Sequence, residues 1–132
     1  MRETNHAARV LVVEDQFLVA HDCELQLQSA GFECVGLAST ADEAINLACR
    51  HRPDLILMDV RLASRTNGVA AAIEIFERFG IRCIFTSGHA DLATHAEAAQ
   101  AQPLGWLRKP YTAEALIEAV KSGYAAEQLR PH

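Results

Sequence analysis

The chain has 132 residues, the usual size of one domain, and half of them are hydrophobic, which is enough for a packed core. The formal net charge of −5 argues against direct nucleic-acid binding, since nucleic-acid surfaces are rich in clustered Lys and Arg. The apolar runs are too short to span a bilayer, and residues 1–9 contain no apolar signal-peptide segment, so we expect a cytoplasmic protein without membrane contact.

Short apolar runs alternate with helical patterns along the chain. Between the first two predicted strands, at about residues 9–13 and 33–37, apolar side chains recur at helical spacing, and Gly31 marks the end of that helix. After the second strand, Thr40 and Glu43 form the Thr-x-x-Glu pattern of a helix capping box. The first half of the chain therefore predicts two strand–helix units.

The second half continues this alternation, with strands expected at about residues 54–58, 82–85 and 104–107. Asp91 is expected to cap a helix that has few large apolar side chains and is therefore held weakly. Thr112 is expected to open the last helix. Five such units with buried strands predict an α/β fold, a doubly wound parallel sheet with helices on both faces.

We expect one domain over residues 9–126, preceded by a flexible segment at 1–8 and followed by a tail at 127–132. The four cysteines form no Cys-x-x-Cys pair and lie among apolar neighbours, which favours reduced thiols in packing roles over a disulfide or zinc site. His89 and His95, near the fourth helix, are expected to be solvated.

Polar residues follow four of the predicted strands: Glu14 and Asp15, Asp59, Thr86, and Lys109. In a doubly wound sheet the binding site lies outside the carboxyl ends of the strands, so these side chains are expected to converge. Three converging carboxylates repel one another, and a divalent cation removes that repulsion. Oxygen ligands favour Mg²⁺ or Mn²⁺ over zinc. The set suits phosphoryl transfer, with Asp59 as the nucleophile and Lys109 as a positive charge.

Several segments, in order and at the family's spacing, resemble the receiver domain of two-component response regulators. The resemblance covers about residues 9–126 and rests on VLVVEDQ, DLILMDVRL, the Asn-Gly pair before the third helix, FTSGH and GWLRKP. It implies a flavodoxin-like receiver fold of the single-domain type, with strand order 2-1-3-4-5. It also implies transfer of a phosphoryl group to the chain from a histidine kinase or a histidine phosphotransfer protein.

The resemblance assigns a role to each matching residue. Asp59 is expected to be the phosphoacceptor, Asp15 to bind Mg²⁺ directly, and Glu14 to bind it mostly through water. The backbone carbonyl of Arg61 is expected to complete the protein ligands. A simpler role for Asp15, as the cap of the first helix, is the alternative.

The remaining assignments concern the response to phosphorylation. Thr86 is expected to follow the phosphoryl group, and Lys109, before a cis peptide bond to Pro110, is expected to pair with a phosphoryl oxygen. Trp106 falls at the switch position, where the family usually has Tyr or Phe. The loop after Asp59 also departs from the family: Ala63 replaces the usual proline, and the loop is one residue longer.

The resemblance implies a phosphoacceptor that catalyses its own phosphorylation and dephosphorylation, rather than a conventional enzyme. Its output is expected to pass to a downstream protein or through self-association, and a phosphate sink without its own output stays open. An aspartyl-nucleophile phosphohydrolase of a doubly wound fold is the alternative. Such enzymes place a second Asp two residues after the nucleophile, where this chain has Arg61.

Overall fold

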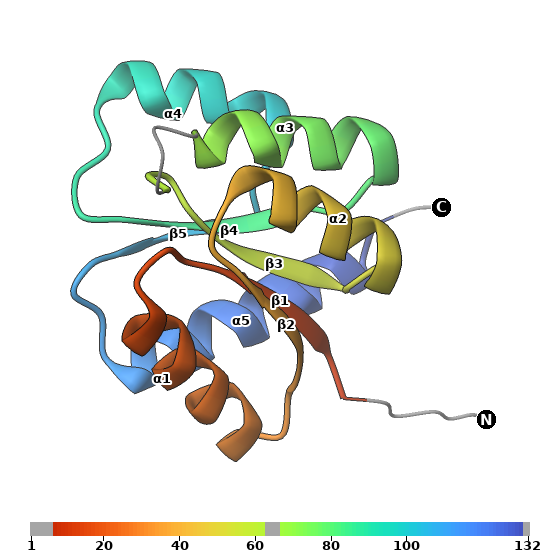
Figure 1. Ribbon diagram of the computed structural model, residues 1–132, viewed down its shortest axis with the longest axis vertical. Helices are drawn as coiled ribbons and strands as arrows, with labels where there is room; N and C mark the ends of the chain where they lie inside the picture. The colour runs from red at the N-terminus through yellow and green to blue at the C-terminus, as the bar shows by residue number, and fades with distance from the viewer. Residues whose placement is uncertain (1–6, 63–66, 131–132) are drawn as a thin grey trace.

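A computed structural model describes residues 7–62 and 67–130. Five parallel strands form one sheet in the order β2-β1-β3-β4-β5, which confirms the predicted fold class and strand order (Figure 1). The strands are β1 (Arg9–Val13), β2 (Glu33–Ala38), β3 (Leu55–Asp59), β4 (Cys83–Ser87) and β5 (Gly105–Arg108).

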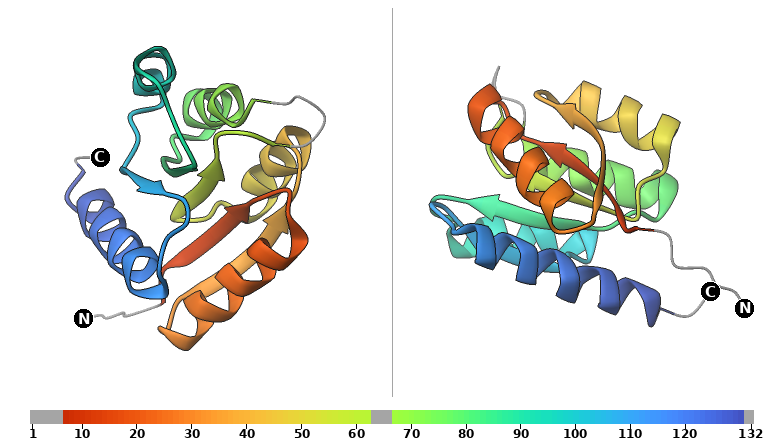
Figure 2. Two further views of the ribbon diagram at one scale, coloured as in Figure 1. Left: turned by 90° about the vertical axis from the view of Figure 1, so that its left-hand side faces the viewer. Right: turned by 90° about the horizontal axis from the view of Figure 1, so that it is seen from below.

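Five α-helices in residues 7–62 and 67–130 cover the two faces of the sheet. Helices α1 and α5 pack on one face, and α2, α3 and α4 pack on the other (Figure 2). The helices are α1 (Phe17–Ser29), α2 (Ala41–His51), α3 (Gly68–Phe79), α4 (Leu92–Ala98, continued by a 3₁₀ turn at Ala99–Ala101) and α5 (Ala113–Gln128). None of the helices in the described part of the chain has the length and apolar character needed to cross a membrane.

Strand β3 shows why the central strands are continuous apolar runs. Successive side chains of a strand point to opposite faces. Leu55 and Leu57 accordingly lie in the core beneath α1 and α5, whereas Ile56 and Met58 lie in the core beneath α2 and α3. Because both faces are covered, every position of the strand is buried.

The expected helix caps are present, with one difference. Asp91 and Thr112 cap α4 and α5, each accepting a hydrogen bond from the backbone N–H three residues later. Thr40 Oγ1 accepts from Glu43 N at 3.1 Å, as in a capping box. The Glu43 carboxylate, however, accepts its two short hydrogen bonds from the backbone N–H and the hydroxyl of Ser39, both at 2.8 Å.

Several boundaries differ from the predicted ones by one or two residues. Strand β3 includes Asp59 and β4 includes Thr86, so both residues lie in the sheet rather than after it. Helix α5 runs to Gln128 and therefore contains the first two residues of the segment predicted as a tail. Ala63 lies outside the described residues, as does most of the N-terminal segment predicted to be flexible.

Candidate functional site

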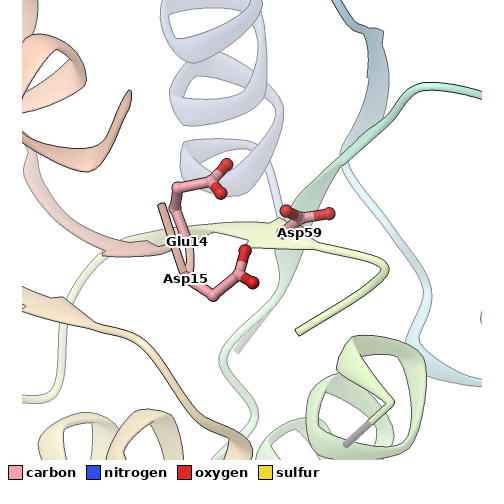
Figure 3. A group of neighbouring side chains, drawn as sticks. All are labelled: Glu14, Asp15 and Asp59. Carbon is pink, nitrogen blue, oxygen red and sulfur yellow. The ribbon is translucent and has the colours of Figure 1, made fainter. Parts of the chain in front are cut away.

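Three acidic side chains meet at the carboxyl edge of the sheet, as predicted. Glu14 and Asp15 follow β1, and Asp59 is the last residue of β3, the strand paired with β1. One carboxylate oxygen from each residue lies within 4.8 Å of the other two (Figure 3). Glu14 and Asp59 are buried, each 5% exposed, whereas Asp15 is exposed.

Lys109 joins the two buried acids. Its Nζ donates to Glu14 Oε1 at 2.7 Å and to Asp59 Oδ2 at 2.8 Å. The backbone N–H of Lys109 donates to the carbonyl of Ser87 at 2.8 Å, which attaches the residue to the end of β4. The peptide bond to Pro110 is cis, as the resemblance implied. The structure thus confirms that Lys109 points into the acidic cluster.

The second carboxylate oxygen of each buried acid accepts a hydrogen bond from a backbone N–H group. Asp59 Oδ1 accepts from Arg61 N, and Glu14 Oε2 accepts from Gln16 N, both at 3.1 Å.

Asp15 does not cap α1: Gln16 is the N-cap residue, and its side chain makes no capping hydrogen bond. The helix-cap alternative for Asp15 is therefore wrong.

Burial and nearby charges act in opposite directions on the pKa of Glu14 and on the pKa of Lys109, and the net result is a raised pKa for both groups. Burial raises the pKa of Glu14 and outweighs the hydrogen bonds from Lys109 and Gln16 that would lower it. For Lys109, burial lowers the pKa, but the hydrogen bonds and charges of Asp59 and Glu14 together raise it. An isolated ion pair would lower the pKa of its acid; Glu14 departs from this because it is more deeply buried than Lys109.

The charges of the site do not balance. Three carboxylates and one ammonium leave two negative charges, which one divalent cation would neutralise. The cluster opens into a surface hollow of about 440 Å³ lined by Asp15, Asp59, Arg61, His89 and Lys109, among others. An all-oxygen donor set beside an open hollow fits Mg²⁺ or Mn²⁺, which keep open positions for water and phosphate.

Thr86 lies directly beside Asp59. It is 4% exposed and is the register partner of Asp59 on the neighbouring strand. The Thr86 carbonyl also accepts a hydrogen bond from Val60 N at 3.0 Å. On the far side of β4, Trp106 of β5 is the register partner of Phe85, so the two predicted switch residues are connected through neighbouring positions of the sheet.

Trp106 packs between two aromatic rings. Its ring centroid is 4.9 Å from that of Phe85 and 3.9 Å from that of His95 on α4. His95 is exposed, but its ring is in contact with Trp106 rather than only solvated as predicted. Nothing in the sequence connects His95 with Trp106, because the pair depends on how α4 packs beside β5.

Gly68 also supports the site. A Cβ added there would lie 1.8 Å from the carbonyl oxygen of Asp59, so only glycine allows α3 to begin this close to the strand end. The Asn67 side chain accepts from Val69 N at 2.8 Å and caps α3. The Asn-Gly pair that precedes the third helix is the sequence signal of this close approach.

Comparison with known proteins places these observations in a family. The sequence model described as the response regulator receiver domain matches residues 10–121. The transcriptional regulatory protein PdtaR of Mycobacterium tuberculosis is 34% identical over 113 residues, which are 86% of this chain and 55% of that protein. The chemotaxis protein CheY of Bacillus subtilis is 29% identical over 115 residues, 86% of this chain and 95% of CheY.

A solved structure agrees with the sequence relatives. The signal receiver domain of a modulated diguanylate cyclase from Desulfovibrio desulfuricans superposes with a TM-score of 0.85 at 30% identity, covering 93% of this chain and 98% of that domain. The chain spans about half the length of PdtaR and 39% of the phyllosphere-induced regulator PhyR of Methylorubrum extorquens, to which it is 30% identical over 80% of its own length. The fold, the site and these relatives show that the chain belongs to the response regulator receiver domain family.

Proposed function

We propose that Asp59 accepts a phosphoryl group from the phosphohistidine of a histidine kinase or a histidine phosphotransfer protein. An Asp59 carboxylate oxygen forms the new bond to phosphorus while the P–N bond breaks, and the electron pair of that bond stays on the imidazole nitrogen. The observation that carries this assignment is the Lys109 ammonium, which contacts Asp59 and Glu14 beside Asp15. Once Asp59 is phosphorylated, Lys109 pairs with a phosphoryl oxygen.

We infer that the acidic cluster holds Mg²⁺ or Mn²⁺. Asp15 and Asp59 would bind the ion directly, Glu14 mostly through water, and the carbonyl of Arg61 would complete the set. Such an ion neutralises charge on the transferring phosphoryl group. The surplus negative charge of the cluster and the open hollow beside it support this site.

The response to phosphorylation is proposed to pass through Thr86 and Trp106. The Thr86 hydroxyl moves toward the phosphoryl group, and Trp106 then changes its packing against Phe85 and His95. The surface formed by α4, β5 and α5 would change with it. We propose that a downstream protein or a second copy of the chain recognises this surface, and that the chain works in the cytoplasm.

Two other roles are distinguished by measurement. A phosphohydrolase would turn over phosphate esters, and the Arg61 side chain offers no carboxylate to act as its general acid. A phosphate sink would take label from the donor as a signalling receiver does, but without a change at Trp106.

Labelling by acetyl phosphate with Mg²⁺, followed by intact-protein mass, tests the assignment. The wild type should gain one phosphoryl group, and Asp59→Asn should gain none. Asp54→Asn is the matched control. Asp54 lies just before the first residue of β3, whereas Asp59 is its last residue, and Asp54 accepts a hydrogen bond from Arg9 N at 2.7 Å. This variant should label like the wild type. Stable labelling of Asp59→Asn would show that Asp59 is not the acceptor.

A further inference from the structure

A hydrogen bond between two neutral side chains joins α1 to the segment that follows Lys109. The sulfur of Cys23 and the hydroxyl oxygen of Tyr111 are 3.0 Å apart. Cys23 is 3% exposed and belongs to the core between the sheet, α1 and α5. Residues 109–112 have no regular structure between β5 and α5, so contacts with neighbouring elements hold the segment in place.

The position of this segment bears directly on the Lys109 ammonium. Nζ has to reach two carboxylates at hydrogen-bond distance, 2.7 and 2.8 Å. The Lys109 backbone is attached to β4 on one side through the carbonyl of Ser87. Two residues further on, Tyr111 is attached to α1, the helix that begins at Phe17, shortly after the acidic pair. The contact therefore links the lysine segment to the acids that Lys109 has to meet.

The Tyr111 side chain packs against the core beneath α1 and α5 and also borders a surface hollow. The hollow has a volume of about 560 Å³ and is lined by Leu18, Val19, Cys23 and Lys109, among others. Burial raises the pKa of the Cys23 thiol and of the Tyr111 hydroxyl, so both stay protonated near neutral pH. The hydrogen bond thus persists under the conditions of phosphoryl transfer.

We propose that the Cys23–Tyr111 hydrogen bond is a positioning contact that holds Lys109 between Glu14 and Asp59 for phosphoryl transfer. Neither residue touches the phosphoryl group; both act through Lys109. Displacements of about 1 Å in a positioning element are enough to slow a reaction. The inference rests on the proposed function of Asp59.

Removing the Tyr111 hydroxyl tests the proposal. Tyr111→Phe should label with acetyl phosphate about threefold more slowly than the wild type at saturating Mg²⁺, the size of effect that one net hydrogen bond has. Tyr124→Phe is the matched control, because it changes the chain's other tyrosine. Tyr124 lies within the electrostatic reach of Asp54, toward the opposite edge of the sheet, and its variant should label at the wild-type rate.

Variants of Cys23 test the same bond from the other side. Cys23→Ala should slow labelling as Tyr111→Phe does, and the double variant should be no slower than either single one, since both remove one bond. Cys23→Ser retains a donor and acceptor and should restore most of the rate. The Lys109→Ala protein should label slowly, so its labelling is followed over longer times. Adding Tyr111→Phe to this protein should not slow its labelling further. If the hydrogen bond had only a structural role, adding Tyr111→Phe would still slow the labelling of Lys109→Ala.

The outcomes separate the two levels of inference. Wild-type rates for Tyr111→Phe, additive effects of the two substitutions, or an undiminished effect without Lys109 would each overturn the positioning role while leaving Asp59 as the acceptor. Wild-type protein that takes no label on Asp59 would overturn the proposed function and this inference with it.

Discussion

Replacing Lys109 by methionine perturbs the electrostatics of the site most directly. The ammonium contacts two carboxylates that are buried, and its own side chain is 26% exposed. Methionine retains an unbranched apolar side chain of similar length but removes the charge and the donors. Glu14 and Asp59 then face each other without the cation that separates them.

The expected cost follows from the geometry. Two unit charges at 4.8 Å, the upper limit for the carboxylate oxygens, repel by roughly 3.5 kcal/mol at an effective dielectric of about 20. The site opens to solvent on one side, and screening reduces this value. We expect Lys109→Met to lower the free energy of unfolding by about 2 kcal/mol near neutral pH without divalent ions.

Urea unfolding followed by Trp106 fluorescence measures this loss, with Lys121→Met as control. Lys121 is the only other lysine and is exposed on α5, so its replacement should change stability by less than about 0.5 kcal/mol. Mg²⁺ should stabilise Lys109→Met more than the wild type, because the site has lost a competing cation. The comparison is made at one fixed Mg²⁺ concentration, where the protein with the lower Kd gains more, and the gain is about 2.7 kcal/mol for a protein whose Kd is one hundredth of that concentration.

The pH dependence has a definite sign. Because the pKa of Lys109 is raised, its contribution is complete below the ordinary lysine value of 10.5 and is lost as the pH rises through the higher value of the folded state. The stability difference between wild type and Lys109→Met should therefore close at alkaline pH. Equal stability near neutral pH, or equal stabilisation by Mg²⁺, would show that Lys109 does not offset the repulsion between Glu14 and Asp59.

Three further predictions concern Glu14, the start of α3 and the ring contact of Trp106. Gly68→Ala forces a Cβ against the Asp59 carbonyl and should lower the free energy of unfolding by about 2 kcal/mol or more, measured by urea unfolding. Burial raises the pKa of Glu14, so Mg²⁺ affinity, measured by titration, should weaken on acidification at a higher pH than an ordinary glutamate of pKa 4.5 would cause. His95→Ala removes a ring from Trp106 and should shift its fluorescence emission to longer wavelength with little change in melting temperature.

Matched substitutions control these experiments. Gly105→Ala places a Cβ in open space and should cost far less stability than Gly68→Ala. Glu14→Gln should abolish the acid-side loss of Mg²⁺ affinity that comes from Glu14. His89→Ala removes a histidine that lines the same hollow as His95 and should leave the Trp106 emission unchanged. Equal effects of Gly68→Ala and Gly105→Ala would contradict the close approach at Gly68, and equal effects of His95→Ala and His89→Ala would contradict the ring contact of His95. An acid-side loss of Mg²⁺ affinity that persists in Glu14→Gln would show that it does not come from Glu14.

The architecture could be predicted from the sequence because buried positions recur in regular patterns along the chain. Strands covered on both faces appear as continuous apolar runs, and amphipathic helices repeat their apolar residues along one face. Since parallel strands end at a shared edge, the positions of Glu14, Asp15, Asp59 and Lys109 along the chain were enough to predict that they meet. Both the acidic cluster and the direction of Lys109 agree with that prediction.

Which individual atoms pair depends instead on how distant parts of the folded chain pack together. The contact of Cys23 with Tyr111 joins residues 88 positions apart, and His95 reaches Trp106 through the packing of α4 beside β5. Such contacts have no periodic signal, because they depend on side-chain direction and on helix placement to within about an ångström. A strand end or a cap is determined by neighbouring residues, whereas the surroundings of a side chain are determined by distant parts of the chain that fold against it.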